Sequence, residues 1–289
     1  MTIRKILVPV SGHYAVSDPQ SLDASALAAG FALSRRFTAG VDVLYVSEPP
    51  STEGTIWAGW LPDYGMDALF AAIERQAGVR YQHAEASYNV ALETVGKPQR
   101  KSAKFIERIG NVSDTVGAYG RLADLIVIAN SEAYWREASR PVLDAALRRT
   151  ARPIFVVPPG QTDAPCRHIA IAWNDTAASA RGVMGALPFL KGADQVEILC
   201  CEAADDYALQ DSSAALSAYL RLHGIDADVH HLVGSAWRAH DAILSKALDL
   251  KCDLLCLGGV THTRAHNLIY GSLTEAVLKE PRIPALIVP

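Results

Sequence analysis

One loop of this sequence combines residue types that could hold an anion. Residues 258–272 read Gly-Gly-Val-Thr-His-Thr-Arg-Ala-His-Asn-Leu-Ile-Tyr-Gly-Ser, and a helical pattern follows at 273–279. Glycines let backbone N–H groups approach a ligand, and Gly271 with Ser272 at a helix start would offer N–H groups and a hydroxyl to a phosphate. The guanidinium of Arg264 could neutralise phosphate charge. These residue types predict a phosphate-binding loop.

Short apolar runs that precede such loops alternate with helical spacings along the whole chain. The runs are typical of strands buried on both faces. Strands are expected at 4–10, 41–47, 103–108, 124–129 and 153–157, and then at 167–173, 195–201, 226–232, 253–258 and 284–288. Helices are expected at 22–35, 66–84, 177–190 and 211–223. This alternation predicts a parallel sheet with helices on both faces.

The two halves of the chain repeat each other. Segments of the first half recur in order in the second, pairing 3–11 with 166–174, 123–129 with 252–258, and 152–158 with 283–289. Such self-similarity indicates a duplicated unit. The Pro- and Gly-containing segment between the copies is typical of a linker. We predict an α/β protein of two tandem doubly wound, Rossmann-like domains at 1–160 and 166–289, each with a five-stranded parallel sheet.

The loop after the fourth strand of the second copy resembles that of the universal stress protein family. That family carries Gly, two residues, Gly, nine residues, and then Gly and Ser or Thr. Gly258, Gly271 and Ser272 match this pattern, while Thr261 stands at the second glycine position, where its hydroxyl could donate to a phosphate. The chain is therefore identified as a tandem member, and the resemblance implies an adenine nucleotide alpha hydrolase-like fold in each half.

The resemblance also implies a ligand, which is ATP or a related adenine nucleotide, with Mg²⁺ as its companion ion. The family usually has an acidic residue after the first strand, near the adenine and ribose; Asn174 takes that position here, beside Asp175, and Cys201 after the second strand would offer backbone groups to the adenine. The predicted binding residues are Asn174, Asp175, Cys201, Gly258, Thr261, Arg264, Gly271 and Ser272.

The corresponding loop of the first copy, at 129–141, contains no glycine, and its first strand ends in Ser-Gly-His without a carboxylate. We expect this copy to be nucleotide-free and mainly structural. Family members pair through their last strands, so 155–158 and 286–289 are expected to meet in an intrachain pseudo-dimer that hides two strand edges. A homodimer of whole chains is compatible with the same resemblance.

Composition excludes several partners. The net charge is −4 without a Lys/Arg block, which argues against nucleic acid as a partner. No uncharged apolar run reaches the roughly 18–20 residues of a membrane helix, and the N-terminus lacks the order of a signal peptide. We expect a cytoplasmic protein that contacts no membrane. The cysteine count is odd at five, and four of them, Cys200, Cys201, Cys252 and Cys256, lie in apolar runs, which fits a reducing compartment.

The usual catalytic signatures are missing from the sequence. There is no Gly-x-Ser-x-Gly elbow, no His-Glu-x-x-His motif and no Gly-x-x-x-x-Gly-Lys-Ser/Thr loop. His262 and His266 are four residues apart but have no third metal ligand nearby in the sequence. We predict neither catalytic residues nor a metal site, and leave weak ATP hydrolysis open.

Three functions are compatible with these features. The first is a stress-response sensor or regulator that binds an adenine nucleotide in its second domain. The second is a nucleotide-independent stress-response scaffold, which would bind other proteins or apolar ligands through its sheet ends and the long loop 49–65 that carries Trp57 and Trp60. The third is a flavin-binding electron-transfer protein of the same layered fold, for which no motif is present.

Overall fold

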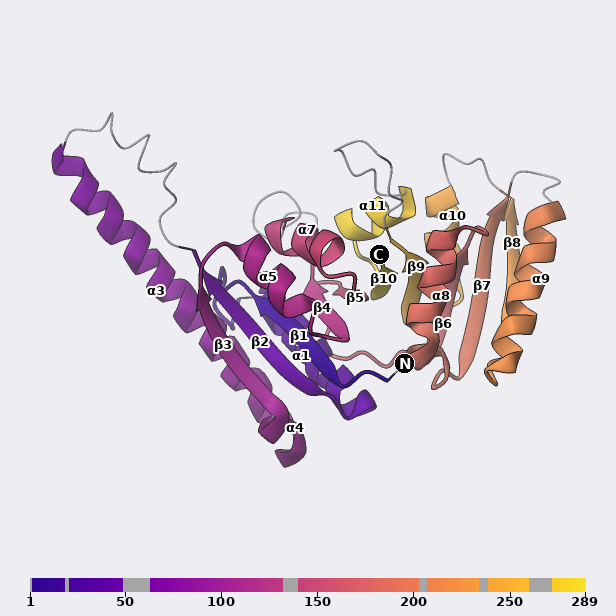
Figure 1. Ribbon diagram of the computed structural model, residues 1–289, viewed down its shortest axis with the longest axis horizontal. Helices are drawn as coiled ribbons and strands as arrows, with labels where there is room; N and C mark the ends of the chain where they lie inside the picture. Colours follow the sequence, from indigo (N-terminus) through magenta and orange to yellow (C-terminus); the bar gives the residue numbers. More distant parts are fainter. Residues whose placement is uncertain are drawn as a thin grey trace.

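Ten strands form one continuous sheet in the computed structural model, which describes residues 2–18, 21–48, 63–131, 140–202, 207–233, 239–259 and 272–289 (Figure 1). The strands of the first half are β1 Lys5–Val10, β2 Gly40–Ser47, β3 Ala103–Ile109, β4 Leu125–Ala129 and β5 Ile154–Val157. Those of the second half are β6 His168–Trp173, β7 Gln195–Glu202, β8 Asp228–Val233, β9 Leu254–Gly258 and β10 Ala285–Val288. All ten lie within two residues of their predicted bounds.

Helices connect these strands and cover both faces of the sheet. In the first half they are α1 Leu22–Phe37, α3 Asp63–Glu93, α4 Lys97–Ser102, α5 Val112–Gly120 and α7 Arg140–Arg149. In the second half they are α8 Ala177–Leu190, α9 Tyr207–Leu222, α10 Ala239–Asp249 and α11 Ser272–Lys279. The predicted doubly wound α/β architecture is therefore present.

The strand order reads as the same five-strand arrangement written forwards and then backwards. It is β3-β2-β1-β4-β5-β10-β9-β6-β7-β8. Every neighbouring pair is parallel except β5 and β10, which run antiparallel with Leu286 opposite Phe155. The contact expected between these two strand ends is thus observed. The domain limits 1–160 and 166–289 stay a prediction.

Two layers of apolar side chains hold the helices to the sheet. One layer contains Leu27 of α1, Tyr88 of α3, Val183 of α8 and Leu216 of α9. The other contains side chains of α5, α7, α10 and α11, such as Leu143. The parallel strands are covered on both faces because their alternating residues supply both layers.

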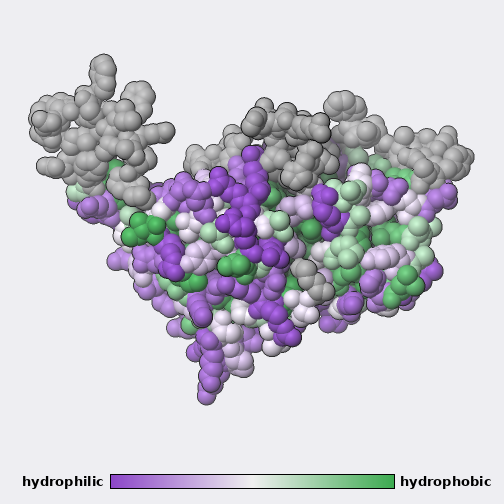
Figure 2. Space-filling view, viewed as in Figure 1, coloured by the Kyte–Doolittle hydropathy of each residue, from purple (hydrophilic) through white to green (hydrophobic). Residues whose placement is uncertain are grey.

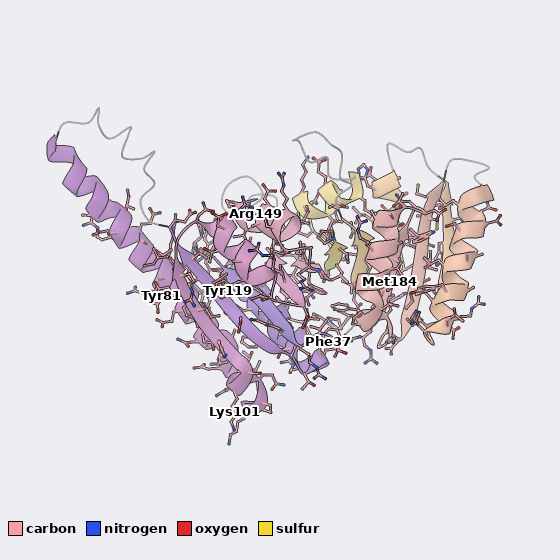
Figure 3. The ribbon with its side chains drawn as sticks, viewed as in Figure 1. Phe37, Tyr81, Lys101, Tyr119, Arg149 and Met184 are labelled. Atoms are coloured by element: carbon pink, nitrogen blue, oxygen red, sulfur yellow. The ribbon has the colours of Figure 1, made fainter. Side chains whose placement is uncertain are left out.

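Aromatic packing joins the two halves beside the central strand pair. The ring of Phe189 in α8 lies 4.9 Å from that of Phe37 and 5.9 Å from that of Phe155, measured between centroids. Phe37 lies at the end of α1 between the halves (Figure 3). The adjacent Arg36 donates from Nη1 to the carbonyl of Pro165 at 2.8 Å. Apolar stacking and a charge-assisted bond thus tie the first half to the linker and to α8.

Helix α3 is longer than the sequence pattern suggested. It begins at Asp63, inside the segment predicted as a loop, and continues past the expected end at Ala84 to Glu93. Ala84, Tyr88 and Ala91 are all buried, and their spacing keeps one apolar stripe on the helix. Most of the predicted loop, with Trp57 and Trp60, lies outside the described residues.

The outer surface in Figure 2 is hydrophilic over the tip formed by α4, and its apolar residues fall in separate small patches on this face. Among the described helices, including the 31-residue α3, none combines the length and the apolar character needed to cross a membrane.

Candidate functional site

A cavity of about 210 Å³ lies at the carboxyl ends of β6, β7 and β9, where open α/β sheets hold their ligands. Three of the predicted binding residues, Asn174, Cys201 and Gly258, line it together. Helix α11 begins at the predicted Ser272, and its next two residues also line the cavity. The sequence prediction and the geometry therefore point to the same edge of the sheet.

The remaining predicted residues have other positions. Asp175 is not among the residues around this cavity; it lines a groove between α8 and α9. Its φ of 53° turns the chain in the left-handed region at this point, a conformation that Asp tolerates better than most residues. Thr261, Arg264 and Gly271 lie outside the described residues.

The first turn of α8 fixes the position of Asn174. Thr176 is the N-cap of this helix, and it forms a reciprocal capping box with Ser179. The hydroxyl of Thr176 donates to Oδ1 of Asn174 over 2.8 Å. Because the amide oxygen of Asn174 is engaged in this way, its NH₂ group is the one that could donate to a ligand.

Gly258 is required by packing as well as by its place at the cavity. A Cβ atom built on Gly258 would lie 2.2 Å from the carbonyl oxygen of Ala178, so no side chain fits between β9 and α8. Gly182 of α8 faces the same contact, because its own added Cβ would lie 2.8 Å from the nitrogen of Gly258. The two glycines let helix and strand approach closely.

His240 is a cavity residue that the sequence analysis did not select. It lies in the first turn of α10, and its Nδ1 atom is buried without a hydrogen-bond partner among the described residues. Its Nε2 atom lies 3.5 Å from Oδ1 of Asp241. A buried polar atom without a partner is costly, so Nδ1 of His240 is a destabilising feature beside this cavity. The sequence feature that could have indicated His240 is its position at the start of α10, which follows β8, the third strand of the second half.

Cys201 is the cysteine most accessible to solvent. It is half-buried at the cavity, whereas Cys166, Cys200, Cys252 and Cys256 are buried. Burial raises the pKa of Cys166 and of Cys252 to about 12. At mildly alkaline pH these two thiols stay protonated and unreactive, because the thiolate is the nucleophile.

No family model matches the sequence, and no curated protein matches it. Solved structures do match. A universal stress protein from Archaeoglobus fulgidus aligns over 98% of this chain and 97% of its own, with 15% identity and a TM-score of 0.66. The chain has the tandem universal stress protein fold. A candidate universal stress protein from Pseudomonas aeruginosa aligns over 99% of this chain and 93% of its own, with 14% identity and a TM-score of 0.58.

A further structure, a functionally unknown protein from Pseudomonas aeruginosa, aligns over 99% of this chain and 92% of its own, with 15% identity and a TM-score of 0.55. These alignments span both halves. The universal stress protein fold is therefore shared across the full length of the chain, although few residues are identical.

In this universal stress protein fold the first half has a cavity at the position equivalent to the second-half site. It lies at the carboxyl ends of β1 and β2 and has a volume of about 460 Å³. Its first loop is held by the buried Asp23, whose Oδ2 accepts from the backbone N–H of Gly12 at 2.7 Å. Burial raises the pKa of Asp23, although the hydrogen bonds from Ser11 and Gly12 act in the opposite direction. The first half, expected to be mainly structural, thus contains the larger cavity.

Proposed function

We propose that the second half binds ATP or a related adenine nucleotide and that the protein acts as a sensor or regulator in a stress response. The observation that carries the proposal is the convergence of Asn174, Cys201, Gly258 and His240 on one cavity at the carboxyl ends of three parallel strands. Universal stress proteins of matching length share this fold, which makes a stress-response role the natural context.

The walls of this cavity suit a flat base with polar edges. Ala172, Ile243 and Leu257 supply apolar surface, and ligand pockets typically combine such surface with a few placed polar groups. The NH₂ group of Asn174 would then bond to the base or ribose, and the ring of His240 would lie beside it.

The phosphates would extend toward the start of α11 at Ser272. A helix start offers free N–H groups to anions, and Thr261, Arg264 and Gly271 would complete the phosphate contacts with Mg²⁺ as companion ion. Hydrolysis is not required for sensing, because binding alone can shift the population of a conformation that holds the nucleotide better.

The test is isothermal titration of the full chain with ATP and Mg²⁺. Ala239 lines the cavity at the start of α10, so Ala239→Trp should fill it and abolish the binding heat. Ala218→Trp is the matched control, because Ala218 is exposed on α9 and does not line the cavity. Binding to the wild type and the control, but not to Ala239→Trp, is expected. Equal binding to all three proteins would place the nucleotide elsewhere.

The alternative of a nucleotide-independent scaffold has one observation in its favour. A groove of about 560 Å³ between α8 and α9 is lined largely by apolar residues, among them Trp173, Met184 and Leu216, and Met184 is 55% exposed. Figure 3 shows Met184 on the α8 side of the second half. Exposed apolar surface of this kind is typical of protein docking sites. A wild-type protein that gives no heat with ATP would favour this function.

A further inference from the structure

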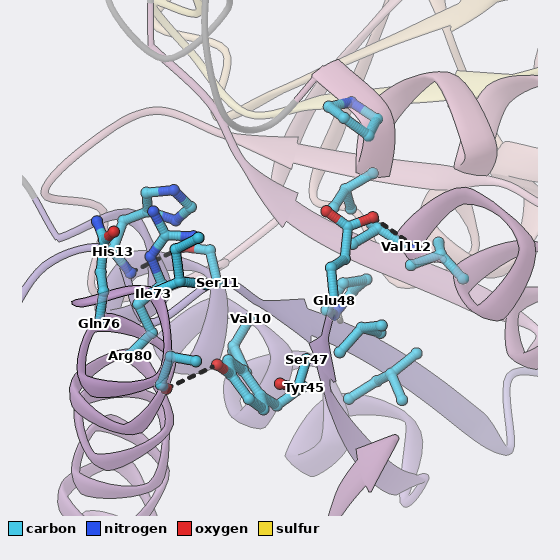
Figure 4. A pocket seen from close by; sticks show the side chains of 17 residues that line it. Val10, Ser11, His13, Tyr45, Ser47, Glu48, Ile73, Gln76, Arg80 and Val112 are labelled. Carbon is cyan, nitrogen blue, oxygen red and sulfur yellow. Dashed lines mark hydrogen bonds between the residues drawn. The ribbon is translucent and has the colours of Figure 1, made fainter. Parts of the chain in front are cut away.

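The cavity of the first half has the size of a small-molecule site and does not depend on the second-half site. Its volume of about 460 Å³ falls within the roughly 300–1,000 Å³ usual for ligand pockets. Side chains from β1, β2, α3, α5 and α7 line it, and Figure 4 shows them facing a common space.

One end of this cavity is cationic. Ile73, Gln76 and Arg80 follow each other at helical spacing on α3 and face the cavity beside His13. Arg80 forms no ion pair with any residue that the structure describes, so its guanidinium is available to an anion. Burial, and then the charge of Arg80, lower the pKa of His13, which agrees with a positive potential at this end.

This cationic end is held in place by close backbone packing. Gly12 has a φ of 64°, and a Cβ built on it would lie 1.9 Å from the carbonyl oxygen of Arg80. The loop that carries His13 therefore rests directly on α3. Asp23 fixes the other side of the loop through the N–H groups of Ser11 and Gly12. Preorganisation of this kind reduces the entropic cost of binding.

The opposite end of the cavity is apolar, and the one carboxylate that lines it already accepts a hydrogen bond. Val112, Val116 and Val142 line it from α5 and α7. Glu48 accepts a hydrogen bond from the backbone N–H of Val112 over 3.1 Å, so its negative charge occupies the start of α5. Figure 4 shows Glu48 and Val112 across the cavity from Arg80.

We propose that the first-half cavity binds a small organic acid, with its carboxylate on Arg80 and its apolar body against the valines of α5 and α7. A carboxylate matches the donor fork of a guanidinium. A polyphosphate fits this cavity less well, because several negative charges would face the single Arg80 and approach Glu48. The proposal concerns a ligand other than the nucleotide of the second half.

The experiment compares two ligands of the same size and apolar body, one with an anionic carboxylate and one with a neutral amide. The full chain is titrated with 4-phenylbutyrate and with neutral 4-phenylbutyramide. The acid should bind at millimolar concentration or below, and the amide should bind at least about tenfold more weakly, because it lacks the charge that Arg80 recognises. Equal binding of both compounds, or no binding of the acid, would overturn the proposal.

Variants locate the bound acid. Arg80→Gln should weaken binding of 4-phenylbutyrate by about tenfold or more. Arg75→Gln removes the same charge from an exposed position on the same helix that does not line the cavity, and binding should stay unchanged. Equal affinities of the two variants would contradict the assignment.

A blocking variant tests the apolar end independently. Val142 is partly buried at the start of α7, so Val142→Trp should fill the cavity and abolish acid binding. Circular dichroism checks that the variant is folded. ATP binding in the second half should be unaffected, and ATP should not displace the acid from the wild type. Displacement by ATP would mean that both compounds use one site and would contradict this proposal, and titration of Ala239→Trp with ATP would then show whether the nucleotide still needs the second-half cavity.

Discussion

Leu286 of β10 lies directly opposite Phe155 of β5, and this antiparallel pair joins the two halves in the middle of the sheet. Both side chains are fully buried. The last strand of each half would otherwise present an unpaired edge, and exposed edges invite association with other chains. The duplication therefore lets one chain close the edge that a single unit would leave open.

Truncation of Phe155 should destabilise the whole chain. Phe155 packs between the halves and stacks on Phe189, so Phe155→Ala should lower the free energy of unfolding by about 3–5 kcal/mol. Leu122→Ala is the control, because Leu122 is 75% exposed and should change stability by less than about 0.5 kcal/mol. Urea denaturation measures both. A small loss for Phe155→Ala would show that the inter-half packing contributes little.

A buried carboxylate should make stability depend on pH. Glu197 of β7 accepts hydrogen bonds from Nε2 of His168 at 2.8 Å and of His230 at 2.7 Å. Burial alone would raise the pKa of Glu197, but the bonds and charges of the two histidines outweigh it and lower the pKa. A carboxyl whose pKa is lower in the folded state stabilises the fold above its unfolded pKa, and this stabilisation is lost as the pH falls.

Glu197→Gln should therefore cost more stability at neutral pH than at acidic pH. We expect a loss of about 1–3 kcal/mol near neutrality, because the charged acceptor between two histidines is removed. The loss should shrink as the pH falls below the ordinary glutamate pKa of about 4.3, where the unfolded chain takes up the proton first, and it should vanish once the pH is below the lowered folded pKa. Urea denaturation of both proteins across this range is the measurement. A pH-independent difference would show that the charge of Glu197 does not stabilise the fold.

Two glycine substitutions should change the free energy of unfolding in opposite directions. Gly258→Ala forces a Cβ against the carbonyl of Ala178 and should lower the free energy of unfolding by about 1–3 kcal/mol or more. Gly78→Ala lies within α3 with no atom near the added Cβ, so it should stabilise by up to about 1 kcal/mol. Thermal melting compares the two variants. A neutral Gly258→Ala would remove the packing argument for this residue.

The sequence predicted the strands well because a strand buried on both faces is a short apolar run, as in β4 and β9. It underestimated α3, whose later turns carry polar residues around the buried stripe of Ala84, Tyr88 and Ala91. The duplication was visible because three strand segments kept their apolar pattern in order.

The sites were harder to predict, because they depend on which side chains meet in space. Asn174, Cys201 and Gly258 were found from a rule about strand ends. Arg80 and His13 are 67 residues apart and meet only because α3 packs on Gly12, which no local pattern indicates. His240 stands out only because its buried Nδ1 atom has no hydrogen-bond partner among the described residues, which a sequence does not show.

The most direct test of nucleotide binding uses the thiol of Cys201 at the cavity. Native protein is treated with iodoacetamide at mildly alkaline pH, and mass spectrometry follows each cysteine. Cys201 should react first, because the other four thiols are buried. Saturating ATP with Mg²⁺ should slow its alkylation by about tenfold or more, whereas 4-phenylbutyrate should not. A rate for Cys201 that ATP leaves unchanged would contradict nucleotide binding in the second half.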